Sequence, residues 1–388
     1  MAAMFEQNPP LSLYIHIPWC VRKCPYCDFN SHEIKNGIPE EQYIDSLMRD
    51  LEQSLPLIWG RSIQTVFFGG GTPSSFSAAA IDQILCGVRS RIKLSPNAEI
   101  TLEANPGTTE QSSFSDLKAT GINRISIGIQ SFDDLALKRL GRIHSSQEAK
   151  SAIEAARNAG FDNINLDLMF GLPKQSLDKA ITDLEYALGY APEHLSYYQL
   201  TLEPNTAFAH SPPTLPVDAI IEEIHETGLK ILESNGYSRY EVSAFAAQGR
   251  QCRHNLNYWR FGDYIGIGAG AHSKITHIPD KRVIRQWKHK HPNHYMDSTS
   301  TFIQGERDLT SDDLSLEFMM NALRLSDGFE FELFSQRTGL PLSEIEDKIH
   351  QAKQAGLLRS NPIKNCLQAT PRGFHFLNDL LAYFIADE

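Results

Sequence analysis

The sequence has few cysteines for its length and lacks a long apolar run. Six cysteines in 388 residues are too few for a disulfide scaffold. No run approaches the roughly 18–20 apolar residues of a membrane-spanning helix, and the opening MAAMFEQNPP does not resemble a signal peptide. Positive charge is not in excess either, since 36 Lys and Arg stand against 47 Asp and Glu, a net charge of −11. We therefore expect a soluble, cytoplasmic protein that does not coat nucleic acid.

Short apolar runs alternate with longer amphipathic ones from residue 11 to about 200. The apolar runs are rich in Ile, Val, Phe and Tyr, as buried strands are. They predict strands at 11–17, 63–68, 99–103, 124–129, 163–169 and 194–200. The amphipathic runs predict helices near 40–55, 77–92, 109–120, 147–159 and 176–190. This alternation indicates right-handed βαβ units around a parallel sheet, as an open barrel or a doubly wound sheet.

Polar residues and glycines follow several of these strands. The second strand ends in Gly69–Thr72, and Glu103, Gln130 and Asp167 lie in or just after the next three. Ligands of parallel α/β folds bind at the carboxyl ends of the strands. The sequence therefore places a site at that edge of the sheet.

The pattern changes in the second half of the chain. A helix is expected near 217–234, and residues 277–295 hold four His and five Lys or Arg, which suits either a ligand-binding segment or a solvated basic loop. Helices near 313–325, 331–338 and 343–355, followed by two short β-like runs, predict a small winged-helix-like domain. Residues 301–388 hold 8 Lys and Arg against 14 Asp and Glu, which argues against contact with phosphates of DNA.

The strongest local signal is the segment HIPWCVRKCPYC at 16–27. Its cysteines, Cys20, Cys24 and Cys27, have C-x3-C-x2-C spacing directly after the first strand. The same spacing could be one face of a helix, but Pro18 and Pro25 favour a loop, and three thiolates on one loop are usually metal ligands. Structural zinc prefers four protein ligands, whereas an iron–sulfur cubane held by three cysteines keeps one iron open to a small molecule.

This cysteine motif, with an aromatic residue before its last cysteine, resembles the signature of the radical S-adenosylmethionine (SAM) superfamily. The segments YIHIPWC, GGGTPS, TLEANPG, SIGIQSF, GRIHS and DLMFGLP resemble its coproporphyrinogen dehydrogenase-like (HemN/HemW) branch over nearly the whole chain. The resemblance implies a partial (β/α)6 barrel, with Cys20, Cys24 and Cys27 binding a [4Fe–4S] cluster. It also implies a SAM pocket lined by Tyr14, Tyr26, Gly70, Gly71, Thr72, Glu103, Gln130, Arg142 and Asp167.

Two functions of this branch compete. One is an oxygen-independent coproporphyrinogen III dehydrogenase, in which a 5′-deoxyadenosyl radical abstracts hydrogen from the propionates. The other is a haem chaperone, which keeps the fold but binds haem and delivers it to client proteins. The dehydrogenases carry a C-x3-C-x2-C-x-C motif, and in this sequence Phe29 stands at the position of its fourth cysteine. The dehydrogenases also carry a longer N-terminal extension, whereas about a dozen residues precede the first strand here.

Residues 254–259, HNLNYW, resemble the HNxxYW haem-binding element of the chaperones. A neutral imidazole from His254 could ligate haem iron, and Tyr258 and Trp259 offer flat faces to the macrocycle. In the basic segment, Lys281, Arg282 or Arg285 could hold haem propionates. We expect haem near His254, outside the SAM pocket.

The interpretation that we adopt is a haem chaperone of the HemW type, not a substrate-converting enzyme. We expect a radical SAM barrel core (1–240), an α/β extension (241–305) and a helical C-terminal domain (306–388). The expected cofactors are a [4Fe–4S] cluster, SAM and haem. The expected partners are client haemoproteins, membrane-bound respiratory enzymes among them, with peripheral membrane contact and a cluster-dependent homodimer as further expectations.

Overall fold

Six parallel strands in chain order form the centre of the molecule. The computed structural model describes residues 5, 7–35, 37–107, 113–363 and 365–385. The six strands pair in the order in which they occur along the chain: β1 (Leu11–Ile17), β4 (Ile63–Gly70), β5 (Leu94–Ala104), β6 (Arg124–Gln130), β7 (Ile164–Phe170) and β8 (His194–Gln199). All seven residues of β6 are buried, as its apolar run predicts. The predicted strands are confirmed, because both faces of a parallel sheet are covered and favour such runs.

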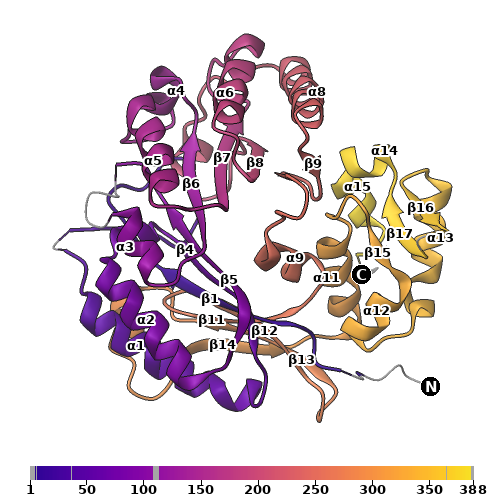
Figure 1. The fold of residues 1–388 in the computed structure, drawn as a ribbon. Coiled ribbons are helices and arrows are strands. Elements are labelled where there is room, and N and C mark those ends of the chain that lie inside the picture. Colours follow the sequence, from indigo (N-terminus) through magenta and orange to yellow (C-terminus); the bar gives the residue numbers. More distant parts are fainter. Residues whose placement is uncertain (1–4, 6, 36, 108–112, 364, 386–388) are drawn as a thin grey trace.

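Helices cover the outer side of this sheet (Figure 1). They are α1 (Glu40–Ser54), α2 (Ala78–Arg91), α3 (Phe114–Ala119), α4 (Asp134–Arg139), α5 (Ser146–Asn158), α6 (Leu177–Gly189) and α8 (Asp218–Ser234). Serine side chains at Ser77, Ser113, Ser145 and Ser176 accept hydrogen bonds from the first turns of four of them, which fixes where these helices begin. The predicted helix near 109–120 begins at Phe114, and 108–112 lie outside the described residues.

The extension continues the same sheet beyond β1. Strand β11 (Asp263–Ile267) pairs in parallel with β1, and three antiparallel strands follow it. They are β12 (His272–His277), β13 (Arg282–Lys288) and β14 (Ile303–Asp308). The basic segment 277–295 is therefore not a loop, since it holds β13 and α10 (Pro292–Met296). Two lysines of the extension form buried ion pairs, Lys274 with Asp263 (3.0 Å) and, within the basic segment, Lys288 with Asp50 (2.5 Å).

The opposite edge of the sheet ends in two short strands, β10 (Ala244–Ala246) and β9 (Ser238–Arg239). Among the described strands, β9 and β14 are the two ends of a twelve-stranded sheet, so the barrel is open, as expected for a partial (β/α)6 barrel. Two short helices, α7 (Ala207–His210) and α9 (Arg253–Trp259), belong to the connections. Helix α9 lies between the strands and the C-terminal domain (Figure 1).

The C-terminal domain has its own apolar core, with Phe318, Phe334 and Leu367 fully buried in it. Its helices are α11 (Ser311–Ala322), α12 (Phe331–Thr338), α13 (Glu346–Gln354), α14 (Pro371–His375) and α15 (Leu377–Ala382). A small sheet of β15 (Phe329–Glu330), β16 (Leu358–Asn361) and β17 (Cys366–Ala369) supplies the expected wing-like hairpin. No helix within the described residues is long and apolar enough to cross a membrane.

Candidate functional site

The three clustered cysteines lie on one loop after β1. Two short parallel strands, β2 (Trp19–Cys20) and β3 (His32–Glu33), close the loop at its base. Cys20 is buried, and Cys24 and Cys27 are partly exposed. All three are free thiols, and the Cys27 backbone N–H donates to the Cys24 carbonyl (3.1 Å). Within the described part of the chain, no three His, Cys, Asp or Glu side chains converge on a point that would hold a single metal ion.

The glycine-rich turn after β4 packs directly against this loop. A Cβ added to Gly71 would lie 2.4 Å from the Trp19 carbonyl oxygen and 3.0 Å from the Cys20 sulfur. Gly70 has a φ of +115°, and a Cβ there would meet the His16 ring at 2.6 Å. Only glycine fits both positions. The turn therefore brings its backbone close to the Cys20 sulfur.

Hydrogen-bond donors point at two of the cysteine sulfurs. The Thr72 hydroxyl donates to the Cys20 sulfur (3.5 Å), and Arg142 Nη1 donates to the Cys24 sulfur (3.6 Å). Such donors stabilise thiolates that ligate iron–sulfur clusters. Asn105 joins the two donors, since it donates to Thr72 Oγ1 (3.0 Å) and accepts from Arg142 Nη2 (2.8 Å). Asn105 was missed as a site residue, although it lies in the TLEANPG segment.

Arg142 also keeps one donor available. Its Nε is buried and has no hydrogen-bond partner among the described residues, whereas Nη2 donates to the Gly128 carbonyl as well (2.9 Å). An unpartnered guanidinium N–H beside a cysteine loop suits an anionic ligand group. The donor set and the close glycine turn fit a [4Fe–4S] cluster with a carboxylate-bearing cofactor.

Carboxylates line the strand ends next to this turn. Glu103 accepts from the Gly70 backbone N–H (3.3 Å). Burial, followed by the nearby charge of Asp167, raises the pKa of Glu103 to about 8. Burial also raises the pKa of Asp167, although Ser126 and Asn165 donate to its carboxylate (3.2 and 2.7 Å). A carboxyl that keeps its proton can donate a hydrogen bond to a ligand as well as accept one, and a bound cationic group would lower both pKa values again.

Tyr26 and Gln130 contribute to the next part of the wall. Tyr26 packs against Phe208, with ring centroids 6.3 Å apart. Gln130 has a φ of 67° at the end of β6, and its Oε1 accepts from the Tyr198 hydroxyl (2.7 Å). The predicted SAM residues thus lie on the cysteine loop, on five of the six core strands, or in the segments that follow β4 and α4.

A large cavity opens beside these residues, and we call it the carboxyl-edge cavity. Its volume is about 1020 Å³, within the range for small-molecule sites. Tyr14, Gly70 and Glu103 line it together with Tyr258 and Trp259. Three of the nine predicted SAM residues thus share this cavity with the aromatic residues of the HNxxYW segment.

His254 does not reach this cavity. Its side chain is 1% exposed, with Nδ1 2.7 Å from the Thr65 hydroxyl and Nε2 2.9 Å from the Tyr258 hydroxyl. Burial, and then the charge of Arg124, lowers the pKa of His254 to about 3, so the imidazole is neutral. Ligation of iron by His254 therefore requires Tyr258 to release Nε2.

The cavity wall includes an imidazole and two lysines that the sequence analysis did not name. His272, at the start of β12, is exposed and stacks on Trp287 with ring centroids 6.5 Å apart. Burial, followed by the charges of Arg285 and Lys290, lowers the pKa of His272, which keeps it neutral. Lys23, Lys290 and Arg285 also line the cavity. Of the three cations predicted for propionates, Arg285 is at the cavity, whereas Arg282 pairs with Asp308 (3.4 Å).

Comparisons with known proteins identify the family. Residues 14–187 match the radical SAM superfamily, and residues 309–376 match the HemN C-terminal domain. The chain is 49% identical to the Escherichia coli protein named heme chaperone HemW, over 98% of this chain and 99% of that one. It is 31% identical to the Bacillus subtilis protein of the same name, over 97% and 99% of the two chains. This chain belongs to the HemW family. Membership in the radical SAM superfamily implies a [4Fe–4S] cluster and SAM.

A solved structure confirms the fold. The Escherichia coli coproporphyrinogen III oxidase HemN, described as a radical SAM enzyme, superposes with a TM-score of 0.81. The comparison covers 99% of this chain and 92% of HemN at 23% sequence identity. At 23% identity this similarity establishes the shared fold and carries no conclusion about function. The HemW family match agrees with the HNxxYW segment and with Phe29 at the position of the fourth cysteine.

Proposed function

We propose that this protein is a haem chaperone that carries haem in the carboxyl-edge cavity and transfers it to client haemoproteins. The relatives' shared name supports haem transfer, and the cavity wall supports the place. Cys20, Cys24 and Cys27 would hold the cluster, and the nine predicted residues around the glycine turn would hold SAM. When bound, such a cluster can supply one electron to SAM.

Trp259 carries the haem proposal most directly. Its indole Nε1 is buried without a hydrogen-bond partner among the described residues, although the ring lines the cavity. Arg324 covers the ring, with its guanidinium carbon 4.4 Å from the ring centroid. Tyr258 is held beside it by an edge contact with Tyr264 (centroids 4.5 Å apart). Two fixed aromatic rings on one wall provide the flat apolar surface that a macrocycle needs.

Cations on the other wall suit the haem propionates. Lys23 and Lys290 line the cavity, and the Lys23 ammonium donates to the Phe29 carbonyl (3.0 Å). Phe29 itself is 60% exposed at the same cavity, an unusual exposure for a large apolar side chain. An amphipathic ligand with one apolar body and two carboxylates matches this mixture of exposed ring and free charge.

Two histidines, His254 and His272, are candidates for the axial ligand of the haem iron. His254 is the residue that the motif designates, and it can ligate only after the Tyr258 hydroxyl has moved away. His272 already faces the same cavity, and no described residue hydrogen-bonds to its ring. We retain His254 as the proposed haem residue and treat His272 as its competitor.

Titration of haemin into anaerobically reconstituted protein tests the proposal. The wild type should give a saturable Soret shift at one equivalent, and His254→Ala should lose it. Tyr258→Phe separates two roles of His254, because it removes the competing hydroxyl but keeps the ring. If His254 ligates iron, Tyr258→Phe binds haem at least as well as the wild type, whereas His272→Ala has no effect on the spectrum.

If His254 acts only by holding Tyr258, His272→Ala should instead change the Soret position, and Tyr258→Phe should weaken binding. Absence of saturable binding by the wild type would overturn the chaperone function. Loss of coproporphyrinogen III in the presence of SAM and a reductant would then support the dehydrogenase.

A further inference from the structure

A second cavity lies at the opposite edge of the barrel, where the strands begin, and we call it the amino-edge cavity. Its volume is about 850 Å³, and its floor includes Leu11 of β1 and Ser62, Gln64 and Thr65 at the start of β4. Four arginines line it: Arg61, Arg253, Arg260 and Arg337. No Asp or Glu is among its described lining residues, although the chain as a whole has a net charge of −11.

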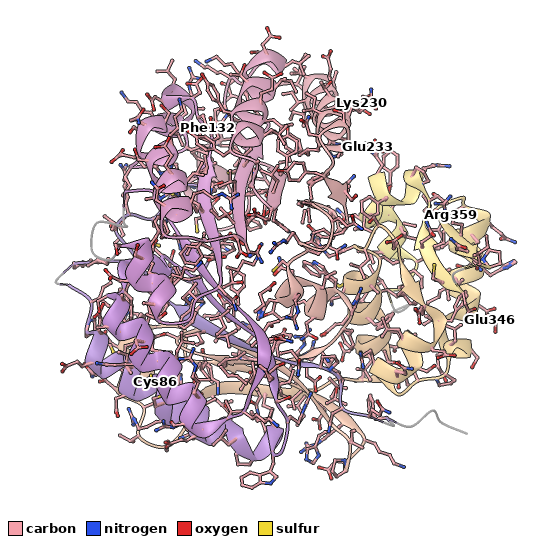
Figure 2. The ribbon with its side chains drawn as sticks, in the orientation of Figure 1. Cys86, Phe132, Lys230, Glu233, Glu346 and Arg359 are labelled. Atoms are coloured by element: carbon pink, nitrogen blue, oxygen red, sulfur yellow. The ribbon has the colours of Figure 1, made fainter. Side chains whose placement is uncertain are left out.

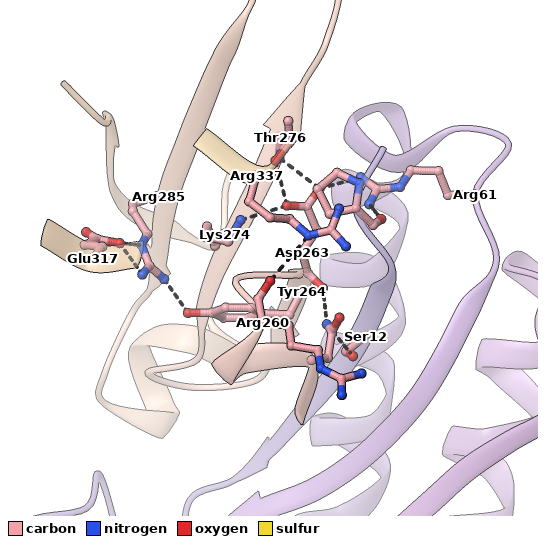
Figure 3. Close-up of polar contacts among 12 residues, drawn as sticks. Ser12, Arg61, Arg260, Asp263, Tyr264, Lys274, Thr276, Arg285, Glu317 and Arg337 are labelled. Carbon is pink, nitrogen blue, oxygen red and sulfur yellow. Dashed lines mark hydrogen bonds and ion pairs between the residues drawn. The ribbon is translucent and has the colours of Figure 1, made fainter. Parts of the chain in front are cut away.

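Among the described residues, only one of these arginines pairs with a carboxylate. Arg61 pairs with buried Asp263 (2.8 Å) and donates to the Pro9 carbonyl (2.6 Å), and Asp263 also receives Lys274 and Thr276 (Figure 3). Arg61 is thus a fixed part of the wall whose charge is offset only in part, because it shares the one carboxylate of Asp263 with Lys274.

The other three guanidiniums are without a carboxylate partner among the described residues. Arg253 donates to the Asn97 carbonyl (2.6 Å), and Arg337 Nε donates to the backbone carbonyl of Arg260 (3.3 Å, Figure 3). The Arg260 side chain is exposed and makes no hydrogen bond to the described residues. Burial, and the charge of Arg260, lower the pKa of Arg337, although Asp263 acts in the other direction. A bound anion would relieve this repulsion between neighbouring cations.

We propose that the amino-edge cavity binds a small soluble anion that carries at least two phosphate groups. Guanidinium forks match phosphate oxygens bidentately, and three of them without carboxylates call for a ligand with several negative charges. The concave shape and the volume favour a small molecule over a flat lipid surface. Gln7, Asn8 and Gln336 add amide groups to the wall.

This site is separate from the proposed haem site, although the two share a helix. Arg253, Leu256, Asn257 and Arg260 of the α9 region line the amino-edge cavity, whereas Tyr258 and Trp259 line the carboxyl-edge cavity. The Asn257 amide donates to the Asp263 carbonyl (2.8 Å) and the Ser12 hydroxyl (2.8 Å), which fixes α9 to the sheet between them. Anion binding in the amino-edge cavity and haem binding in the carboxyl-edge cavity can therefore be tested separately.

Calorimetric titration with inorganic triphosphate tests the proposal on the full chain. The wild type should bind one equivalent, with affinity that falls as salt rises. Arg260→Gln/Arg337→Gln should weaken binding about tenfold or more, because two charge-assisted contacts are lost. Arg359→Gln makes the same type of substitution at an exposed arginine of the C-terminal domain (Figure 2), removes one positive charge, and should bind like the wild type. Arg61 is left intact because its change would strand Asp263 and perturb folding.

Four outcomes would overturn the proposal, three from anion binding and one from a haemin control. The first is no saturable triphosphate binding by folded wild type, and the second is equal affinity of the double variant. The third is arginine-dependent binding to vesicles of phosphatidylglycerol without any binding of triphosphate, which would make the surface a membrane contact. Haemin titration of the double variant is the control on specificity: an unchanged Soret shift supports a separate anion site, whereas its loss would assign the arginines to haem propionates and overturn the proposal.

Discussion

The carboxyl-edge and amino-edge cavities differ in how their residues are distributed along the sequence. Part of the first comes from short motifs, with Lys23 on the cysteine loop, Gly70 in the glycine turn, and Tyr258 and Trp259 in HNLNYW. The second is built from Arg61, Arg253, Arg260 and Arg337, which no motif connects. A sequence motif is found where a ligand contacts several residues of one loop. A charge cluster needs no motif, because folding can bring together residues that are far apart in the sequence.

Helix α9 is the element that separates the two cavities. Arg253, Leu256, Asn257 and Arg260 follow the i, i+3, i+4, i+7 spacing of one helical face and line the amino-edge cavity, whereas Tyr258 and Trp259 line the carboxyl-edge cavity. Glu99 holds the start of the helix, accepting from the backbone N–H groups of Arg253 (3.2 Å) and His254 (3.0 Å). A single short helix thus presents aromatic rings to one cavity and arginines to the other.

The largest expected effect is on the cysteine loop. Replacing Cys20, Cys24 and Cys27 together by Ser should abolish cluster assembly, because no thiolate ligand remains on the loop. Iron and sulfide are to be measured after anaerobic reconstitution. Cys86→Ser is the control, since Cys86 is exposed on the outer helix α2 (Figure 2) and should leave the cluster content unchanged. Retention of iron and sulfide by the triple variant would show that other residues hold the cluster.

Asp263→Asn should disturb both cavities at once. It removes the carboxylate that Arg61 and Lys274 share, and these cations then remain buried without a full counter-charge. Removal of one partner from a buried pair costs about 3–5 kcal/mol of unfolding free energy, which urea denaturation measures. Asp45→Asn is the matched control, because its ion pair with Arg49 is exposed and worth less than about 1 kcal/mol. Equal stability of the two variants would refute a structural role for the Asp263 network.

Asp263 also predicts a loss of stability in acid. Burial opposes its ionisation, but Lys274 and Arg61 hold the pKa of Asp263 below its ordinary value. A carboxyl with a depressed folded pKa stabilises the protein above its unfolded pKa, and this contribution is lost as the pH falls through the folded pKa. The stability difference between wild type and Asp263→Asn should therefore shrink as the pH is lowered below about 4.

A smaller, local effect is expected at the glycine turn. Gly71→Ala places a Cβ against the Trp19 carbonyl and the Cys20 sulfur, so the loop or the turn must shift. We expect reduced cluster content and weaker SAM binding in reconstituted protein, with the fold retained. Gly189→Ala, at the end of α6 with open space around the added Cβ, should behave like the wild type. If both variants bind SAM normally, the turn does not form the cofactor wall.

The smallest effect is a pH dependence at Glu103. Because the folded pKa of Glu103 is raised to about 8, the folded protein keeps a proton that the unfolded chain has already lost. Stability therefore falls as the pH rises from about 5 to about 8. Glu103→Gln, which is permanently neutral, should melt higher than the wild type near the upper limit and approach it near the lower limit. The charges that face Glu103 are those of Asp167 and Arg124. Thermal melts of both proteins across this pH range test the prediction, and a difference in melting temperature that does not change with pH would contradict it.

The sequence predicted the parts of the molecule in which the pattern of residue types matches the burial or the chemistry of the folded protein. The six core strands were found because both of their faces are buried, and the cysteine loop because its spacing carries chemistry. An α/β extension was expected, but the positions of its strands were not predicted, since Lys274 and Lys288 resemble surface residues and only the fold supplies Asp263 and Asp50 as buried partners. His272 and Lys290 were not predicted for a similar reason. They belong to no motif, and the antiparallel pairing of β12 with β13 brings them to the cavity.

Neighbouring residues at the end of α9 permit the most direct test that haem occupies the carboxyl-edge cavity. Trp259→Ala removes an aromatic wall of that cavity, and Arg260→Ala removes a cation from the amino-edge cavity. Haemin titrations of both variants are to be compared with the wild type at matched cluster content. We expect Trp259→Ala to lose the saturable one-equivalent Soret shift and Arg260→Ala to retain it. Retention by Trp259→Ala together with loss by Arg260→Ala would place haem in the other cavity and contradict the account.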